Sequence, residues 1–232
     1  MTVMNERDIT PEELQQVELV EADTDALSAL VGDLSARPRR KRQLAAHVLA
    51  LVAARKPELL SGHVDALLEA LDQPEAQTRW EVLDALTLLV EGHAREIGAA
   101  YDAAEEALFD EDSATLRLAA FRMLCTWGST ERRRSEKVWP LLDEAIQCYH
   151  GDLEYRDMLV CLHDFATGKI DGHVAGELAG RLHFDAENGK GTYLRARSSE
   201  IYDLLVKRFK LENPQKRARA VAKSGDDGED EE

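Results

Sequence analysis

The segments Arg79-Trp-Glu-Val-Leu-Asp-Ala-Leu86 and Arg117-Leu-Ala-Ala-Phe-Arg-Met-Leu124 each start with an arginine and continue into an apolar stretch with helical spacing. Similar segments recur along the chain, so that successive arginines are separated by 37, 38, 39 and 39 residues. A period of about 40 residues with two helices in each unit predicts a helical solenoid, because each repeat can bury its apolar face only against its neighbours. The five arginines are Arg42, Arg79, Arg117, Arg156 and Arg195.

Prolines and glycines divide each repeat into two helices, since proline suits a helix start and prevents the preceding helix from continuing. No segment alternates apolar and polar residues in the manner of a strand, so we expect no sheet. The expected helices cover residues 38–55 and 62–71, 74–90 and 93–108, 113–127 and 135–149, 152–167 and 172–183, and a final helix at 192–210.

The first 35 residues predict two helices that close the N-terminal end of the stack. Thr10, Pro11 and Glu13 have the spacing of a capping box with proline at the first helical position, so a helix is expected over 11–20. A second helix is expected over 24–35. The predicted organisation is therefore a capping pair at 1–35, the repeats at 36–212, and a tail at 213–232 that is first basic and then acidic.

The repeats resemble HEAT repeats, which are antiparallel helix pairs stacked into a solenoid. The segment 56–71 is similar to the turn and second helix of that family, and an aspartate or asparagine precedes three of the arginines by seven residues. The resemblance covers residues 36–210, although Ser35 and Tyr149 replace the aspartate in the first and fourth repeats. It implies an all-α, right-handed α-solenoid of about four to five helix pairs with an N-terminal capping pair. It also implies a structural ladder between adjacent repeats, made by Arg42, Asp72, Arg79, Asp110, Arg117, Arg156, Asn188 and Arg195.

The formal net charge of −16 is concentrated at the two ends of the chain. Residues 1–36 have a net charge of −8 and residues 224–232 have a net charge of −6, which leaves about −2 for the repeats. Local clusters therefore decide what this chain attracts, and the total charge does not.

Cysteine usage and the N-terminal residues indicate the cytoplasm. Cys125, Cys148 and Cys161 are odd in number and fall in predicted helices, as expected in a reducing compartment. The first residues lack the layout of a signal peptide, and no apolar run is long enough for a membrane span. We expect a cytoplasmic protein without membrane contact.

The sequence offers little support for a metal site or for catalysis. Cys148 and His150, with Cys161 and His163, have the ligand types of a zinc site, but residues two apart on a helix point in different directions. No phosphate-binding loop or nucleophile elbow is present. We therefore expect no catalytic residue, metal or cofactor. Helical-repeat DNA glycosylases use an aspartate with tryptophans in a basic groove, and with Trp80, Trp127 and Trp139 present this class stays open as an alternative.

Three basic clusters provide a further alternative, a module that binds the phosphates of nucleic acid. Such a module needs the clusters to converge on one face. Their residues are Arg39, Arg40 and Lys41, then Arg132, Arg133 and Arg134, then Lys216, Arg217 and Arg219.

The function that we expect is a non-catalytic scaffold or adaptor that presents a repeat surface to a partner protein. The second helices are expected to line the concave face. The second helix of the second repeat is acidic, which favours a partner with a basic segment. The candidate contact residues are Glu96, Tyr101, Asp102, Glu105, Lys137, Asp143 and Glu144.

Overall fold

The computed structural model describes residues 9–211, which contain helices and turns but no β-strand. The chain divides into two compact units, Met1–Ile170 and Asp171–Glu232. The α-helices of the first unit are α1 (Pro11–Ala22), α2 (Thr24–Gly32), α3 (Arg39–Arg55), α4 (Val64–Glu69), α5 (Ala76–His93), α6 (Tyr101–Leu108), α7 (Ala114–Gly128), α8 (Arg132–Tyr149) and α9 (Tyr155–Thr167). Its short 3-10 helices are η2 (Asp33–Ser35), η3 (Pro57–His63), η4 (Ala70–Asp72) and η5 (Ile97–Ala100).

Helix α1 begins at the capping box that the sequence predicts. The Thr10 hydroxyl accepts a hydrogen bond from the backbone N–H of Glu13 at 3.3 Å, and the Glu13 carboxylate accepts one from the backbone N–H of Thr10 at 2.8 Å. Pro11 occupies the first helical position, where its missing N–H has no intrahelical partner to lose. The start of the first helix is therefore specified locally.

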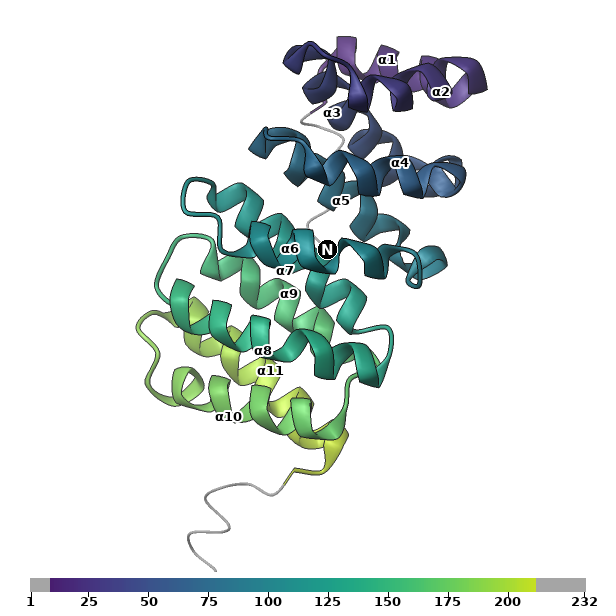
Figure 1. Ribbon diagram of the computed structural model, residues 1–232. Helices are drawn as coiled ribbons and strands as arrows, with labels where there is room; N and C mark the ends of the chain where they lie inside the picture. The colour runs from purple at the N-terminus through teal and green to yellow at the C-terminus, as the bar shows by residue number, and fades with distance from the viewer. Residues whose placement is uncertain (1–8, 212–232) are drawn as a thin grey trace, which may run out of the picture. The chain divides into compact units, whose positions relative to one another are not determined.

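Helices α1, α3, α5, α7 and α9 pack side by side in chain order and form what we call the first-helix row (Figure 1). Two contacts fix the direction of α1 within the row. His47 of α3 lies 3.1 Å from Glu13 of α1, and Arg55 of α3 lies 2.8 Å from Glu21 of α1. Both pairs are 34 residues apart, so α1 and α3 run parallel. The N-terminal pair predicted as a cap thus takes the place of a further repeat in this row.

Four of the five periodic arginines occupy the same position in their helices. Arg42, Arg79, Arg117 and Arg195 are each the fourth residue of a helix, whereas Arg156 is the second residue of α9. The fourth residue lies one turn after the helix start, so its long side chain can reach back to the carbonyls of the preceding loop. The period seen in the sequence therefore marks the starts of equivalent helices.

The second helices of the repeats lie on one side of the first-helix row, as α4, α6 and α8 do in Figure 1. Each packs against a first helix, but consecutive second helices touch one another far less than consecutive first helices do. The expected position of the second helices on the concave face of the solenoid stays a prediction.

Two second helices are broken into short pieces, where the sequence predicts continuous helices at 62–71 and 93–108. The first consists of η3, α4 and η4, and the second of η5 and α6. Gly98 in η5 lies against the ring of Trp127, where a Cβ atom would come within 3.1 Å. The Trp127 indole N–H donates to the Ala94 carbonyl at 2.7 Å and holds the turn before η5 in place. Close packing against α7 therefore determines this local geometry.

The first unit has a continuous apolar core between the first-helix row and the second helices. Its largest fully buried side chains include Leu49, Leu83, Leu86, Phe121 and Phe165, each from a helix of the first-helix row. Burial of a leucine or phenylalanine side chain contributes about 1.5–3 kcal/mol. The row is thus held together mainly by apolar packing, and the polar contacts described below specify its register.

The second unit contains the helix pair α10 (Gly172–Asn188) and α11 (Thr192–Phe209), which pack closely on one another. Gly191 joins the two helices with a φ of 101°, in the left-handed region that favours glycine. Helix α10 extends five residues beyond the predicted end at residue 183. The predicted tail at 213–232 lies outside the described residues. Within residues 9–211, no helix is long and apolar enough to cross a membrane.

Candidate functional site

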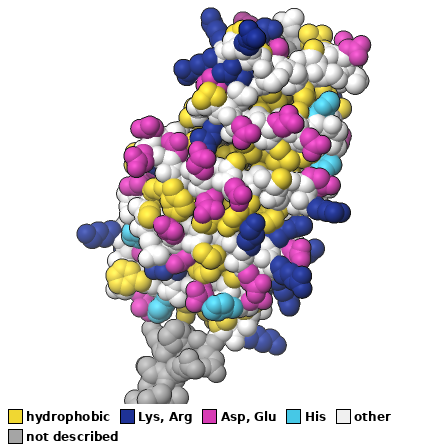
Figure 2. Space-filling model, in the orientation of Figure 1, with side chains coloured by type: hydrophobic (Ala, Val, Ile, Leu, Met, Phe, Trp, Pro, Cys, Tyr) yellow, Lys and Arg dark blue, Asp and Glu magenta, His cyan; other side chains and the backbone are white. Residues whose placement is uncertain are grey.

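The second helices of the first two repeats form a strongly acidic surface. Residues 57–72 and 96–112 contain eleven aspartates and glutamates and no lysine or arginine, and ten of these acids are exposed. Figure 2 shows acidic side chains gathered over α4 and α6, with apolar side chains between them. We call this region the acidic surface; its acids are Glu58, Asp65, Glu69, Asp72, Glu96, Asp102, Glu105, Glu106, Asp110, Glu111 and Asp112.

Most carboxylates of the acidic surface are not neutralised by neighbours. Within residues 9–211, Glu106 is the only one of them that forms an ion pair, with Arg79 at 3.5 Å, and its side chain stays 79% exposed. Asp110 caps the turn before α7, because its carboxylate accepts hydrogen bonds from the backbone N–H groups of Asp112 at 3.0 Å and Ser113 at 2.8 Å. The remaining charges face solvent and attract cations.

An aromatic and cationic cluster lies at the start of α6 and includes two of the predicted contact residues. The Tyr101 hydroxyl donates to the backbone carbonyl of Lys137 at 3.2 Å, and the Lys137 ammonium lies 3.7 Å from the centre of the Tyr101 ring. The Tyr101 and Trp127 rings are 6.2 Å apart, and Arg134 lies 5.4 Å from the Trp127 ring. The fold thus brings Tyr101 and Lys137 together from α6 and α8.

Two acids of α6 lie close enough to Tyr101 to affect its ionisation. The pKa of the Tyr101 hydroxyl is raised, mainly by burial and further by the negative charges of Glu105 and Asp102. The exposed residue Glu96 precedes η5 on the same segment. Two of the predicted acids of the second repeat, Asp102 and Glu105, therefore lie near an aromatic ring that is only half-buried.

Helix α8 carries both signs of charge and is not part of the acidic surface. The Asp143 carboxylate accepts a hydrogen bond from the side-chain amide of Gln147 at 3.0 Å, and Glu144 is exposed. Arg132 and Arg133 are exposed at the other end of this helix. The predicted contact residues thus divide into an acidic set on residues 96–105 and a mixed set on α8.

The two basic clusters that the structure describes lie at opposite ends of the helices. Arg39, Arg40 and Lys41 begin α3, a first helix, whereas Arg132–Arg134 begin α8, which follows α7 after a short turn and runs antiparallel to it. Since α3 and α7 are parallel members of one row, the two clusters lie at opposite edges of the first unit. They form no single phosphate-binding face within residues 9–211. The third cluster at 216–219 lies outside the described residues.

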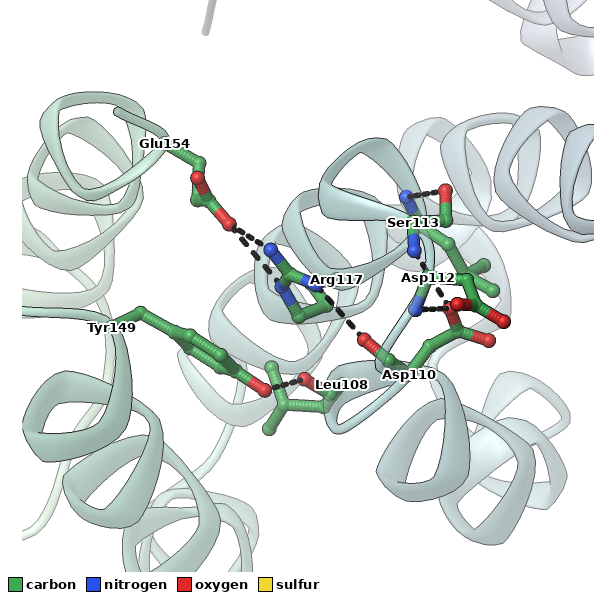
Figure 3. A network of polar contacts seen from close by, with 8 residues as sticks. Leu108, Asp110, Asp112, Ser113, Arg117, Tyr149 and Glu154 are labelled. Carbon is green, nitrogen blue, oxygen red and sulfur yellow. Dashed lines mark hydrogen bonds and ion pairs between the residues drawn. The ribbon is translucent and has the colours of Figure 1, made fainter. Parts of the chain in front are cut away.

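Arg117 is the centre of a polar network that joins two repeats (Figure 3). Its Nε donates to Glu154 at 3.2 Å, its Nη1 donates to the Asp110 carbonyl at 2.9 Å, and its guanidinium lies 4.9 Å from the centre of the Tyr149 ring. The Tyr149 hydroxyl in turn donates to the Leu108 carbonyl at 2.9 Å. Burial alone would raise the pKa of Glu154, but the hydrogen bonds from Arg117 hold it below its ordinary value.

Arg42, on α3, makes the equivalent contacts. Its guanidinium forms two hydrogen bonds with Glu75, one of them from Nε at 3.1 Å, and a further bond with the Ala36 carbonyl at 2.8 Å. The hydrogen bonds from Arg42 lower the pKa of Glu75. Each of these arginines therefore ties the loop before its own helix to a glutamate immediately before the next first helix.

The aspartates and the asparagine that the resemblance assigned to the ladder do not pair with the arginines through their side chains among the described residues. Asp72 is exposed, and Asp110 contacts Arg117 through its backbone carbonyl. In the second unit, Arg195 donates to the Gly189 carbonyl at 2.9 Å, and the Asn188 side chain donates to the Phe184 carbonyl at 3.4 Å. Arg156 is exposed. Arg42, Arg117 and Arg195 thus donate to carbonyls of the loop before their own helix, and Arg42 and Arg117 also pair with a glutamate of the following repeat.

A second polar row crosses the first helices and was not predicted. His47 lies between two carboxylates, 3.1 Å from Glu13 and 2.9 Å from Glu81, and Asp84 forms an ion pair with Arg122. The signal was present in the sequence, since His47, Asp84 and Arg122 each follow a periodic arginine by five residues. Asp84 and Arg122 occupy equivalent positions in adjacent repeats and their opposite charges pair, whereas His47 pairs with Glu81 instead.

The residues considered for metal binding and for base excision are dispersed or buried. Cys148 is exposed, Cys161 is buried, and within residues 9–211 no group of three or more histidine, cysteine, aspartate or glutamate side chains could hold a metal ion. Trp127 and Trp139 are 7% and 6% exposed and belong to the core, whereas Trp80 is half-buried.

Comparisons with known proteins identify the fold through structure alone. No protein-family model matches the sequence, and no curated protein matches it significantly. A designed armadillo repeat protein in complex with the peptide (KR)4 is 16% identical and superposes with a TM-score of 0.66, covering 83% of this chain and 86% of that chain. Computationally designed armadillo repeat proteins for modular peptide recognition are also 16% identical, with a TM-score of 0.62 and coverage of 82% of this chain and 85% of that chain.

A natural protein has the same type of fold. The archaeal HEAT-like repeats protein from Thermococcus onnurineus NA1 is 15% identical, with a TM-score of 0.53, and covers 85% of this chain and 94% of that chain. These similarities confirm the predicted all-α helical-repeat fold. At such low sequence identities, these similarities show the fold but not the function.

Proposed function

We propose that this chain, which has a HEAT- or armadillo-like helical-repeat fold, is a non-catalytic scaffold whose acidic surface binds a basic segment of a partner protein. The proposal rests on one observation: ten exposed acids on residues 57–72 and 96–112, with no lysine or arginine among them. Exposed carboxylates that lack ion-pair partners in the folded chain retain their full attraction for a cationic ligand.

The residues proposed to contact the partner include Glu96, Asp102 and Glu105, which are all exposed on the second repeat. Lys137, Asp143 and Glu144 on α8 are proposed to border this site and to limit how far the basic segment extends. A designed armadillo repeat protein of similar fold has been solved with the basic peptide (KR)4. That complex supports the proposal only in the sense that a repeat fold of this class can hold such a peptide.

A basic peptide titration tests the proposal directly. The probe is an octapeptide of alternating lysine and arginine, compared with a peptide of the same length in which glutamine replaces both residues. We expect binding of the basic peptide alone, with an affinity that falls steeply between about 50 mM and about 300 mM salt, because exposed charges are screened. Equal binding of the neutral peptide would contradict the proposal.

A matched pair of variants locates the binding surface. The double variant Asp102→Asn/Glu105→Gln should weaken binding about tenfold, because each exposed charge pair contributes up to about 1 kcal/mol. The control Glu18→Gln/Asp203→Asn removes the same charge from exposed positions on α1 and α11 and should leave the affinity nearly unchanged. Equal effects of the two variants would mean that the peptide responds only to total charge.

A further inference from the structure

The Tyr101 ring presents an aromatic face that is already covered by a cation of the chain itself. The Lys137 ammonium lies 3.7 Å from the centre of this ring and 5.9 Å from the centre of the Trp127 ring. Tyr101 is the first residue of α6, whereas Lys137 is an exposed residue of α8. An aromatic face attracts lysine, arginine and ligand cations through its ring quadrupole, so this face can hold a cation from a partner as well.

Lys137 is held far less firmly than the neighbouring cation. Arg134 lies over Trp127 and is also fixed by a hydrogen bond to the Thr130 hydroxyl at 2.8 Å and by an ion pair with Glu131 at 3.7 Å. Lys137, by contrast, forms no ion pair within residues 9–211, and its ammonium contacts only aromatic rings there. An exposed contact of this kind is weak, so Lys137 can be displaced.

We propose that the aromatic face of Tyr101 is the anchor subsite for one lysine or arginine side chain of the bound segment, and that Lys137 is a built-in competitor for this subsite. This inference rests on the proposed function. Asp102 and Glu105 flank the ring on the same helix and supply the negative charge that favours the incoming cation. When the partner binds, its cation takes the place of the Lys137 ammonium, which moves into solvent.

Displacement of an internal competitor makes a prediction that simple charge attraction does not make. Removing the Lys137 charge should strengthen binding because the ring becomes free, and this gain should require the ring. Any gain from reduced repulsion alone would persist without the ring. The two effects are therefore separable by a double-mutant cycle between positions 101 and 137.

The experiment measures the affinity of the lysine-arginine octapeptide for the full chain and for its variants. Lys137→Met keeps an unbranched apolar side chain of similar length and should bind the peptide about threefold to fivefold more tightly than the wild type. In the Tyr101→Leu background the same substitution should give no more than the gain from charge removal alone. Arg133→Met, which removes a nearby exposed charge, measures that electrostatic gain in both backgrounds.

Two controls keep the test independent of folding. Tyr101→Phe retains the ring and loses only the hydroxyl contact with the Lys137 carbonyl, so it should keep the full gain from Lys137→Met. In NMR spectra of the wild type, ring currents should shift the Lys137 ε-methylene protons upfield, and peptide addition should return them to the values of a free lysine.

The outcomes separate the inference from the proposed function. Basic-peptide binding that is insensitive to Lys137→Met, or a gain of equal size with and without the Tyr101 ring, overturns the subsite and leaves the scaffold proposal standing. Failure of the wild type and of every variant to bind the peptide overturns both.

Discussion

The first-helix row and the acidic surface belong to the same repeats but use charged residues in opposite ways. Along the first helices, Arg42 pairs with Glu75, and Arg117 pairs with Glu154, with side chains only 7–13% exposed. Over the second helices, Glu105 and its acidic neighbours are exposed and mostly lack ion-pair partners within residues 9–211. Charges between repeats therefore specify how the stack assembles, whereas charges on the second helices remain available for a ligand.

Among the substitutions that test this comparison, we expect the largest change in the free energy of unfolding at Arg117. Arg117→Ala removes the hydrogen bonds to Glu154 and to the Asp110 carbonyl and leaves a largely buried carboxylate without its partner. We expect the free energy of unfolding to fall by about 3 kcal/mol, measured by urea denaturation.

Arg95→Ala is the matched control, since Arg95 is exposed in the turn between α5 and η5. It should change the free energy of unfolding by less than about 0.5 kcal/mol. Equal losses from the two substitutions would mean that the network around Arg117 adds nothing to stability.

The next effect tests the packing of the first-helix row against the second helix α8, at the end of α7. A Cβ atom at Gly128 would come within 2.5 Å of a Val138 methyl group on α8 and within 3.2 Å of the Phe165 ring on α9. Gly128→Ala should therefore lower the free energy of unfolding by about 2 kcal/mol, as overpacking does. Gly92→Ala should raise it by about 0.5–1 kcal/mol, because nothing lies near that position in α5 and alanine favours the helix. Thermal or urea unfolding of the two variants measures the difference.

A smaller effect depends on pH and concerns His47. The hydrogen bond with Glu81 raises the pKa of His47 above its ordinary value of 6.5, although burial opposes the shift. A raised pKa in the folded state means that the stabilisation is complete below about pH 6.5 and is lost as the pH rises through the folded-state pKa.

His47→Gln should therefore cost about 1 kcal/mol at pH 5.5 and progressively less as the pH increases above 6.5. Urea denaturation of the wild type and the variant across this range checks the expected trend. A difference that stays constant from pH 5.5 to pH 9 would show that the charge on His47 contributes nothing.

The smallest effect on stability is expected on the acidic surface. Glu105→Gln should change the free energy of unfolding by less than about 0.5 kcal/mol, because the side chain is exposed and has no ion-pair partner within residues 9–211. The same substitution should weaken binding of the basic peptide. A large loss of stability without a change in affinity would reverse the comparison between the two regions.

The sequence predicted the repeat fold because its signals are local. The arginine period, the prolines at helix starts and the capping box at Thr10 each act within one or two helical turns, and four of the five arginines occupy equivalent helical positions. The broken second helices could not be predicted in this way. Their geometry depends on the packing of Gly98 against Trp127, which are 29 residues apart and meet only in the folded state.

The candidate site was predictable in part for the same reason. The acids of residues 96–105 were expected to face solvent and do so, because an amphipathic segment exposes its polar residues whatever its partner. The glutamate partners of Arg42 and Arg117 lie 33 and 37 residues away, so their identity depends on the angle between repeats. The contact between Tyr101 and Lys137 depends on the same angle. Whether these acids bind a partner stays a prediction.

The parallel orientation of α1 has a consequence for the surface that this helix presents on the side away from α3. Because α1 contacts α3 in the register that first helices share with one another, its backbone would accept another helix pair on its outer side. Glutamate and glutamine side chains are exposed along this helix where an internal repeat would need an apolar face. The exposed face of α1 is therefore polar, and a few polar-to-apolar exchanges on it would create an apolar surface on which a second copy of this chain could stack.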